Sequence, residues 1–457
     1  MRRDDVIAPG DFLLGSPCLH SWSLCLALIL SVMPAFAQPM HTLQQRVDAA
    51  AAGAVIEVPA GTYIGNLVIT RALTLKGAGG AVLDGDGSGD VIRVRAPGVT
   101  IRGLTIRNSG KNLTDMNAGI FAEKSAGNLR VIDNRFDNNA FGLWLDGCRA
   151  PEVIDNRVQG APQLRSQDNG NGIHLFAVHD GLVRGNRISG TRDGIYIDTS
   201  QYNRLEGNYM QDLRYGIHYM YSYNNEVIGN HTRNTRTGYA LMQSKHLEVR
   251  GNVSENDLNY GILMNYIVDS RISGNHVKGT RTGRAFVTGG DDIAGADGKA
   301  LFIYNAQYNQ ITGNVLEDAD IGIHLTAGSE NNAIHSNAFI RNRVQVKYVA
   351  TREQEWSDGG RGNYWSDYLG WDMNADGIGD RPYEPNDAVD KLLWRYPMAR
   401  VLMSSPAIET LRWVQRQFPV FKPQGVRDSH PLMRPPEDAR TGAATTQRTQ
   451  RRKGAET

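Results

Sequence analysis

The sequence predicts an all-β protein, a right-handed parallel β-helix with rungs of about 22 residues, an N-terminal capping helix, and a C-terminal cap followed by a helix. Two recurring phrases and the alternation between them predict this fold class. The first phrase, apolar-x-(Gly or Asp)-Asn, returns at intervals of 22, 30, 22, 22, 22, 23, 39 and 23 residues, and its last copy has Ser before the Asn. Its Asn residues stand at positions 134, 156, 186, 208, 230, 252, 275, 314 and 337.

The second phrase, Gly-apolar-x-apolar, lies between successive Asn residues. It begins at positions 142, 172, 194, 216, 238, 261, 298 and 322. The step from Gly to the next Asn is 14 to 16 residues, whereas the step from Asn to the next Gly ranges from 8 to 23, so the long insertions fall at one corner of the repeat. Alternation with period two, as in residues 194–198 (GIYID), indicates short strands with one buried face, and we expect Gly and Asn to supply corners with positive φ.

A repeat this short cannot bury its own apolar face. Stacking copies about 4.8 Å apart makes a continuous core, and it lets the Asn at each corner hydrogen-bond to its copies along the stack. A propeller would need a period of about 40 residues, and a leucine-rich array would need a Leu-dominated consensus. The chain shows neither pattern.

The chain divides into five predicted segments. These are a signal peptide (1–37), the parallel β-helix (38–352), a C-terminal cap (353–400), a C-terminal helix (401–421) and a disordered tail (422–457). The apolar run from Trp22 to Ala37 ends in small residues suited to a signal peptidase, so we expect export. Its removal leaves Cys148 as the only cysteine, which excludes an internal disulfide.

A covering helix is expected over residues 41–52, with Leu43, Val47 and Ala50 or Ala51 on one side, because the first rung of a stack exposes strand edges.

The charge balance excludes a binder that relies on its net charge. Lys and Arg number 49 and Asp and Glu number 48, for a net charge of +1. Such a chain has no long-range field that would attract nucleic acid, so we expect no nucleic-acid partner.

Three stretches carry a family resemblance. The opening IEVPAGTY (56–63), the rungs GIHYMYS and GIHLTAG, and the closing NYWSDY with D-x-N-x-DGIGD-x-PY together resemble the NosD family, over about residues 40 to 420. The resemblance implies a non-catalytic periplasmic protein that helps to mature the copper centre of nitrous oxide reductase. It also implies four partners, namely an ABC permease, its ATPase, a copper-carrying lipoprotein and the reductase itself, and association with the inner membrane through them.

The outward columns of the stack predict a transient copper(I) site. If the first and third residues after each Gly point inward, the second and fourth point outward, and His218, Met220 and Met242 then share one face. Imidazole with thioether sulfur suits copper(I). The alternative is a Met-rich patch covered by a loop or by a partner surface. The cargo, whether copper, sulfur or a folding intermediate, is left open.

Other residues near this face receive structural assignments. Met210 and Met264 are expected in the core, and His246 is only a spare ligand at a turn. His174 and His324 share the column of His218 without nearby sulfur, and we expect them on the solvated surface. The two long corners, residues 157–171 and 276–297, leave from the same edge and predict a cleft on the order of 15 to 20 Å wide, beside a Gly- and Asp-rich loop at 287–300.

The closing motif also predicts a structural calcium site. Asp372, Asn374, Asp376 and Asp380 place oxygen donors at relative positions 1, 3, 5 and 9, with a Gly at position 6. Position 12 lacks the acidic residue, since Tyr383 stands there. The alternative is a cover closed by ordinary Asx turns.

A helix is expected after Ser405, which would be its N-cap, with Pro406 at the first position. It either docks on the permease or packs back on the barrel. Its apolar stripe consists of Ala407, Leu411, Val414 and Phe418.

Two other function classes compete with the scaffold. A lyase, epimerase or hydrolase acting on acidic sugars would use side chains of the outward columns, although these columns hold no Arg or Lys. They are Asp146, His174, Tyr196, Asp198 and His218. A sugar-binding module would instead stack its ligand on Trp144, Phe176 and Tyr196.

Overall fold

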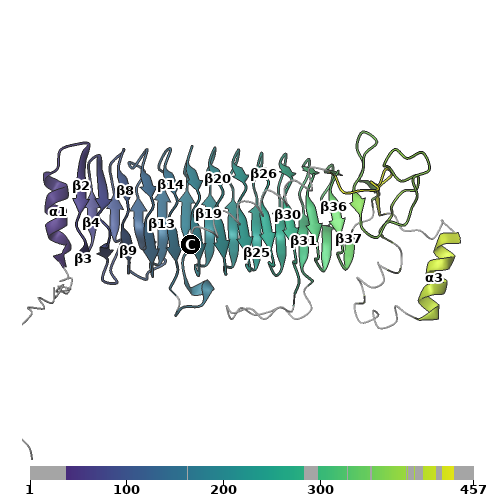
Figure 1. The fold of residues 1–457 in the computed structure, drawn as a ribbon, viewed down its shortest axis with the longest axis horizontal. Helices are drawn as coiled ribbons and strands as arrows, with labels where there is room; N and C mark the ends of the chain where they lie inside the picture. The colour runs from purple at the N-terminus through teal and green to yellow at the C-terminus, as the bar shows by residue number, and fades with distance from the viewer. Residues whose placement is uncertain are drawn as a thin grey trace, which may run out of the picture. The chain divides into compact units, whose positions relative to one another are not determined.

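The fold is an all-β parallel β-helix in a computed structural model of the chain (Figure 1). The structure describes residues 38–161, 163–282, 297–326, 328–349, 352–386, 389, 396, 405–417 and 425–436. The predicted signal peptide, residues 1–37, lies outside them. Three long parallel sheets of 12, 12 and 14 strands form the walls.

Each wall takes one strand from every full rung. The Gly-led sheet is named for the repeated Gly, which lies within or directly before most of its strands: β4 (Leu67–Ile69), β7 (Ile92–Val94), β10 (Ala118–Ala122), β13 (Phe141–Asp146), β16 (Ile173–Phe176), β19 (Asp193–Asp198), β22 (Tyr215–Met220), β25 (Thr237–Met242), β28 (Tyr260–Asn265), β31 (Lys299–Tyr304), β34 (Ile321–Thr326) and β37 (Val344–Val349). The strands that follow it along the chain form the linking sheet: β2 (Ala54–Val58), β5 (Leu73–Gly77), β8 (Thr100–Arg102), β11 (Arg130–Ile132), β14 (Glu152–Ile154), β17 (Leu182–Arg184), β20 (Arg204–Glu206), β23 (Glu226–Ile228), β26 (Glu248–Arg250), β29 (Arg271–Ser273), β32 (Gln310–Thr312) and β35 (Ala333–His335). The strands after the repeated Asn form the Asn-led sheet: β1 (Gln38–Pro39), β3 (Gly61–Ile64), β6 (Ala81–Asp84), β9 (Thr105–Arg107), β12 (Arg135–Asp137), β15 (Arg157–Gln159), β18 (Arg187–Ser189), β21 (Tyr209–Gln211), β24 (His231–Arg233), β27 (Val253–Glu255), β30 (His276–Lys278), β33 (Val315–Glu317), β36 (Ala338–Ile340) and β39 (Tyr364–Trp365).

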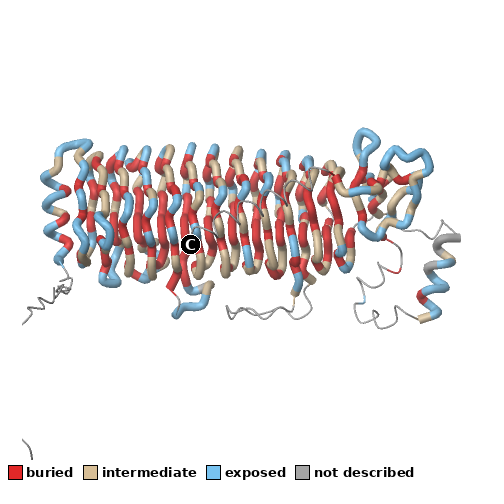
Figure 2. Tube along the Cα trace, viewed as in Figure 1, coloured by how far each residue is buried: buried red, intermediate tan, exposed pale blue. Residues whose placement is uncertain are grey.

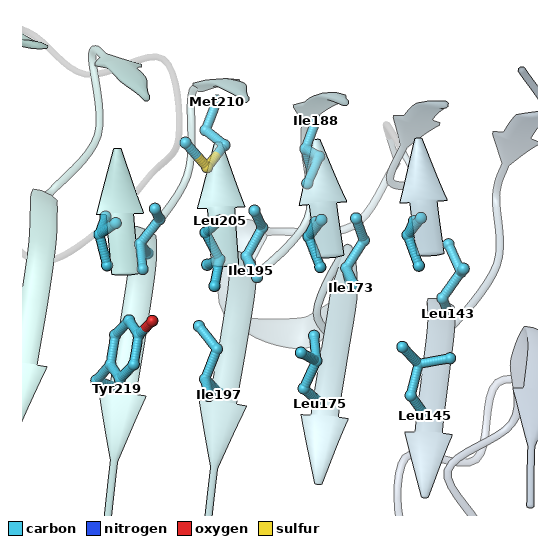
Figure 3. Close-up of a cluster of buried hydrophobic side chains, with 14 of the residues drawn as sticks. Leu143, Leu145, Ile173, Leu175, Ile188, Ile195, Ile197, Leu205, Met210 and Tyr219 are labelled. Carbon is cyan, nitrogen blue, oxygen red and sulfur yellow. The ribbon is translucent and has the colours of Figure 1, made fainter. Parts of the chain in front are cut away.

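The apolar residues of the repeat fill the interior of the stack. In β19 the first and third residues after the Gly, Ile195 and Ile197, are fully buried, and they pair with Ile217 and Tyr219 of the next rung. Figure 3 shows Ile195, Ile197 and Tyr219 among rows of such side chains, and Figure 2 shows buried segments in every rung along the stack. Met210 and Met264 are fully buried, which confirms their placement in the core.

The repeated Asn residues form the predicted ladder. The side-chain oxygen of Asn230 accepts hydrogen bonds from the backbone N–H of Asn208 at 3.0 Å and from its amide group at 2.9 Å. The amide group of Asn230 donates in turn to Leu205 O and to Asn252 Oδ1. Each side chain therefore ties neighbouring rungs together and satisfies backbone groups that the corner leaves unpaired.

The two kinds of glycine have different physical roles. Gly207 and Gly229, which precede ladder Asn residues, have φ values of 61° and 59°, as expected for corners. Gly194 and the other glycines of the second phrase do not have positive φ. A Cβ at Gly194 would lie 2.5 Å from Gly216 O and 2.9 Å from Met210 Cγ. The second phrase therefore needs glycine because the next rung and the core approach its Cα closely.

Helix α1 (Met40–Ala49) covers the first rungs, as predicted. Leu43 and Val47 are buried in the core of the barrel together with Met40, and Ala50 packs partly against it. The helix covers the first strands of the three sheets, β1, β2 and β4, and also contacts β3.

The C-terminal cap draws on a segment that the sequence analysis placed in the disordered tail. Strand β40 (Val426–Arg427) pairs with β38 (Gln354–Glu355), and Val426 and Leu432 are buried. The buried carboxylate of Asp428 accepts hydrogen bonds from the backbone N–H of Asn363 at 2.7 Å and from Trp365 Nε1 at 2.8 Å. The tail prediction is therefore wrong for residues 425–436, because this segment supplies acceptors to the end of the stack.

The C-terminal helix, α3, spans Pro406–Gln417, and residues 401–404 and 418–421 of the expected helix lie outside the described residues. Ser405 caps it, since its carbonyl and hydroxyl oxygens accept the Ile408 N–H at 3.1 and 3.4 Å. Ile408 is buried although it lies outside the predicted stripe. Of that stripe, Val414 is half-buried, Ala407 and Leu411 are exposed, and Phe418 lies outside the described residues. No described helix is long and apolar enough to span a membrane.

Cys148 is buried and free, as expected for a lone cysteine. Burial raises the pKa of its thiol to about 12, so the thiol stays protonated and unreactive near neutral pH.

One carboxyl group lies inside the barrel. Asp257 is fully buried, and its two oxygens accept hydrogen bonds from the Thr235 backbone and from hydroxyl groups. The hydroxyl donors are Thr232, Thr235 and Ser254, at 2.6 to 2.9 Å. Burial outweighs these bonds and raises the pKa of Asp257 to about 6.

Asp257 makes the stability of the barrel depend on pH. The raised pKa means that the folded chain binds more protons than the unfolded chain between about pH 4 and pH 6. The free energy of unfolding should therefore fall by about 2 to 3 kcal/mol as the pH rises through this window, relative to Asp257→Asn. Urea denaturation of both proteins from pH 4.5 to 7.5 measures the difference, and a difference that does not change with pH would contradict the assignment.

Candidate functional site

Aromatic and imidazole rings form a row on the outer wall of the Gly-led sheet. The row consists of Phe121, Trp144, His174, Tyr196 and His218, which pair in register from β10 to β22. Successive ring centroids are 6.4, 3.8, 4.6 and 4.4 Å apart. We call this set the outer row. Its rings contact one another because parallel strands in register place equivalent side chains one rung apart.

Stacking buries the outer row, apart from the half-buried Tyr196, although the row lies on the outside of the barrel. His174 is 5% exposed and packs between Trp144 and Tyr196, so its expected place on the solvated surface is wrong. His324 is also not solvated, because it is half-buried against Phe302. Burial lowers the pKa of His174 and of His324 to about 3, so both imidazoles are neutral near pH 7.

A buried carboxylate fixes the orientation of His218. Asp193 Oδ2 lies 3.0 Å from His218 Nδ1, and Arg214 donates to both oxygens of Asp193 at 2.8 and 2.6 Å. Burial opposes ionisation of Asp193, but the hydrogen bonds from His218 and Arg214 outweigh it and hold the pKa of Asp193 below its ordinary value. Because the ionised carboxylate only accepts, Nδ1 of His218 donates to it, and Nε2 is the ring nitrogen that lies outside this contact.

His218, Met220 and Met242 lie on the outer wall of the Gly-led sheet, and the copper site that they would form stays a prediction. Met220 lies two residues after His218 on β22, a distance of about 6.5 to 7 Å along the strand. Tyr219 and Leu241, the residues just before the two methionines, pair in register. Met220 and Met242 therefore lie on neighbouring strands, whose backbones are about 4.8 Å apart. Both methionines are half-buried.

Sequence reasoning missed the partners of His218. Asp193 directly precedes one repeated Gly, and Arg214 stands two residues before the next. Both therefore lie outside the two outward columns, which begin two residues after each Gly. A visible signal did exist, because Arg192, Arg214 and Arg236 stand two residues before the Gly of three successive repeats. They form a partly buried cationic column beside the outer row, and Arg214 N donates to Arg192 O at 2.8 Å.

Exposed tyrosines border the two methionines. Tyr221 follows Met220 directly, and Tyr266 follows Asn265, which pairs with Met242. Their side chains are 48% and 49% exposed, and their φ values of 47° and 54° lie in the left-handed region. A bulky side chain costs roughly 1 to 2 kcal/mol in that conformation, so this edge keeps exposed aromatic rings at a cost to stability. His246 is exposed at another left-handed corner, away from the outer row.

The two long corners connect the same pair of sheets, as expected. Residues 160–172 join β15 to β16, and residues 279–298 join β30 to β31, so both leave from the edge between the Asn-led and Gly-led sheets. The first corner holds a short 3-10 helix (Ser166–Asp168). Residues 283–296 lie outside the described residues, so the predicted cleft and the loop at 287–300 remain predictions.

The closing motif folds into a loop that its own side chains brace. Asp372 accepts the backbone N–H groups of Asp376 and Gly377, and Asp376 accepts that of Ile378. Asn374 and Asp380 also accept backbone N–H groups. Within the described residues no cluster of three or more His, Cys, Asp or Glu is arranged to hold a metal ion. The Asx-turn alternative describes this geometry directly, and the calcium site remains a prediction.

The residues of the enzyme alternative do not form a free acid–base set. His174 is neutral and His218 is held by Asp193. Asp146 and Asp198 lie two rungs apart in register with Phe176 between them, about 9.6 Å along the axis.

The fold and this face define the class of protein: a parallel β-helical binding protein whose outer wall displays imidazole, thioether and aromatic side chains in rows. A family model described as "Periplasmic copper-binding protein (NosD)" matches residues 154–370. A relative from Pseudomonas aeruginosa (strain PAO1), named "Probable ABC transporter binding protein NosD", is 55% identical over 409 residues, which cover 90% of this chain and 94% of the relative. A relative of the same name from Stutzerimonas stutzeri is 54% identical over 382 residues, 83% of this chain and 87% of the relative. The chain belongs to the NosD family, which confirms the resemblance seen in its motifs.

A solved structure agrees with the fold. PfbA, a surface adhesin of Streptococcus pneumoniae, has a TM-score of 0.54 at 11% identity, covering 72% of this chain and 92% of that one. At this identity the likeness shows the fold alone.

Removing the carboxylate of Asp193 should destabilise the protein, because Arg214 and the Nδ1–H of His218 lose their shared buried acceptor. We expect Asp193→Ala to lower the free energy of unfolding by about 3 kcal/mol, measured by urea denaturation at pH 7. Asp198→Ala on the same strand is the control and should cost less than about 0.5 kcal/mol, since the Asp198 carboxylate accepts a hydrogen bond from the neighbouring, exposed Thr199 hydroxyl. Adding Arg214→Ala to Asp193→Ala should recover part of the lost stability. If the changes in the free energy of unfolding of the two single variants simply add, Arg214 and Asp193 do not stabilise each other, and the account is contradicted.

Proposed function

We propose that the protein is an accessory scaffold that receives copper(I) and passes it on during maturation of the copper centre of nitrous oxide reductase, while docked on an ABC transporter. The observation that carries the proposal is that His218, Met220 and Met242 share one face, with His218 oriented by Asp193. We call these three residues the candidate copper face. Copper here is cargo rather than a resident cofactor. The role is binding and transfer, without catalysis.

The donor set supports copper(I) over harder cations. Two thioethers and one imidazole are soft to borderline ligands, and the carboxylate that contacts His218, that of Asp193, is already engaged by His218 and Arg214. A metal-ligating imidazole usually donates its other N–H to a carboxylate, which is the role that Asp193 would have. Three ligands on an open wall suit an ion that must leave again.

The tyrosine edge supports delivery by a protein rather than by free ions. Tyr221 and Tyr266 are exposed and flank the methionines. The ring centroids of Tyr266 and Tyr304 are 5.9 Å apart. Aromatic and Met side chains are enriched in protein interfaces. We propose that a copper-carrying lipoprotein docks over this edge and presents its ion to His218, Met220 and Met242.

The relatives support the link to a transporter. Two of them are named as probable ABC transporter binding proteins. We propose that this chain likewise binds a permease and its cytoplasmic ATPase, on the periplasmic side of the inner membrane. The apolar side of α3 is one proposed contact, through Ala407, Leu411, Val414 and Phe418.

Copper(I) affinity tests the proposal directly. Under anaerobic conditions, competition with a chromogenic chelator should reveal a strong site in the mature protein. Met220→Ala with Met242→Ala should weaken it roughly 100-fold or more, because two of the three soft ligands are lost. His218→Gln should weaken it by at least about tenfold.

Matched variants elsewhere separate a specific site from general thioether or imidazole binding. Met373→Ala removes a methionine of the cap that is 84% exposed. His246→Gln removes an exposed histidine at a corner away from His218, Met220 and Met242. Both should leave the affinity unchanged. Equal affinity in the wild type and in the Met220→Ala, Met242→Ala variant would end the copper proposal.

A structural calcium ion at Asp372, Asn374, Asp376 and Asp380 is proposed separately. Because an ion that binds only the folded state stabilises it, millimolar Ca²⁺ should raise the Tm of the mature protein, whereas Mg²⁺ should raise it less. Differential scanning fluorimetry after treatment with a chelator measures the shift. An unchanged Tm would leave the Asx-turn cover as the full account of this loop.

A further inference from the structure

Three apolar side chains stand exposed at the tip of the C-terminal cap. Leu369 is 94% exposed, Met373 is 84% exposed and Trp371 is 49% exposed. We call these three residues the cap tip. Isolated exposed apolar residues are common in proteins, but three within five residues on one loop indicate a contact surface.

The cap tip sits on a braced loop. Asp380 N donates to Trp371 O, and Met373 N donates to Asp380 Oδ2, at 2.8 and 2.7 Å. The guanidinium of Arg381 lies 4.9 Å from the centre of the Trp371 ring. At its base the Tyr368 hydroxyl donates to Arg381 O.

The C-terminal segment ties the same loop down. Gly379 N donates to Pro431 O, and Met433 N donates to Gly377 O. A loop held in this way loses little conformational entropy on binding, so its apolar tip is preorganised for contact.

Charge favours a protein partner over a lipid surface. Residues 367–381 contain four Asp and one Arg, a net charge of 1 − 4 = −3, and the loop stays acidic, at −3 + 2 = −1, with the proposed calcium ion bound. A bilayer with anionic lipids repels such a loop, and lipid-binding segments instead carry Lys and Arg beside their apolar residues. The complementary surface is an apolar pocket bordered by Lys or Arg on a protein.

The position of the cap tip leaves the candidate copper face open. Met242 lies on β25, and four rung steps, to β28, β31, β34 and β37, separate it from the end of the Gly-led sheet, about 19 Å along the axis. A partner at the cap and a copper donor at the wall therefore bind without competing.

We propose that the cap tip docks into an apolar, cation-bordered pocket on the outward-facing surface of the transporter's membrane subunit. This inference rests on the proposed function for the identity of the partner. Leu369 and Met373 supply the apolar contact, and the surrounding aspartates select the basic border and orient the approach.

The test measures binding of the full mature protein to the detergent-solubilised permease–ATPase complex by biolayer interferometry. Leu369→Ser with Met373→Ser should weaken binding by about tenfold or more, because side chains this exposed contribute to the interface and little to the fold. Val55→Ser, at a residue that is 62% exposed on β2, is the matched control and should bind like the wild type. Raising the salt concentration should weaken wild-type binding, as charge complementarity requires.

The outcomes separate the cap tip from the proposed function. Equal affinity of the double variant and the wild type overturns the cap tip alone, whereas a wild type that does not bind the complex overturns the transporter partnership and the cap tip together. If the wild type cosediments with protein-free phosphatidylethanolamine–phosphatidylglycerol vesicles and the double variant does not, the cap tip contacts a membrane. That result overturns the proposed protein pocket. Copper(I) affinity of the double variant should equal that of the wild type.

Discussion

The rung-to-rung register is the constraint on which the rest of the structure depends. Parallel backbone ladders hold neighbouring rungs in step, and each buried Asn side chain adds bonds to two of them, as Asn230 does to Asn208 and Asn252. A slip of one residue would turn every apolar side chain of a strand outward and would leave the Asn amides unpaired. The long insertions therefore lie at one corner, where 160–172 and 279–298 leave the stack.

The same register that makes a core inside the barrel makes rows outside it. Equivalent outward side chains come to lie one rung apart, so rings stack on rings and Met220 lies one rung from Met242. Once stacked, these side chains screen one another from water, and the wall acquires a second, smaller buried layer. Only within such a layer does a carboxylate like Asp193 hold an imidazole and a guanidinium firmly, because water does not compete for its hydrogen bonds.

Periodicity predicts what repeats, and it fails where a contact is made once. The fold, the Asn ladder, the buried Met210 and Met264, and the shared face of His218, Met220 and Met242 follow from positions within a rung. The burial of His174 depends instead on which rings happen to stand above and below it. The return of residues 425–436 to the cap depends on contacts such as Asp428 with Asn363, 65 residues apart in the chain, for which a repeat gives no signal.

X-ray absorption at the copper edge of the copper(I)-loaded mature protein tests the central claim most directly, because it counts the ligands that side chains one rung apart bring to a single ion. The account predicts a first shell of two sulfur atoms with one imidazole nitrogen, and a mixed shell of one sulfur with the same nitrogen in Met242→Ala. A shell of nitrogen and oxygen alone, or two sulfur ligands that persist in Met242→Ala, would contradict it.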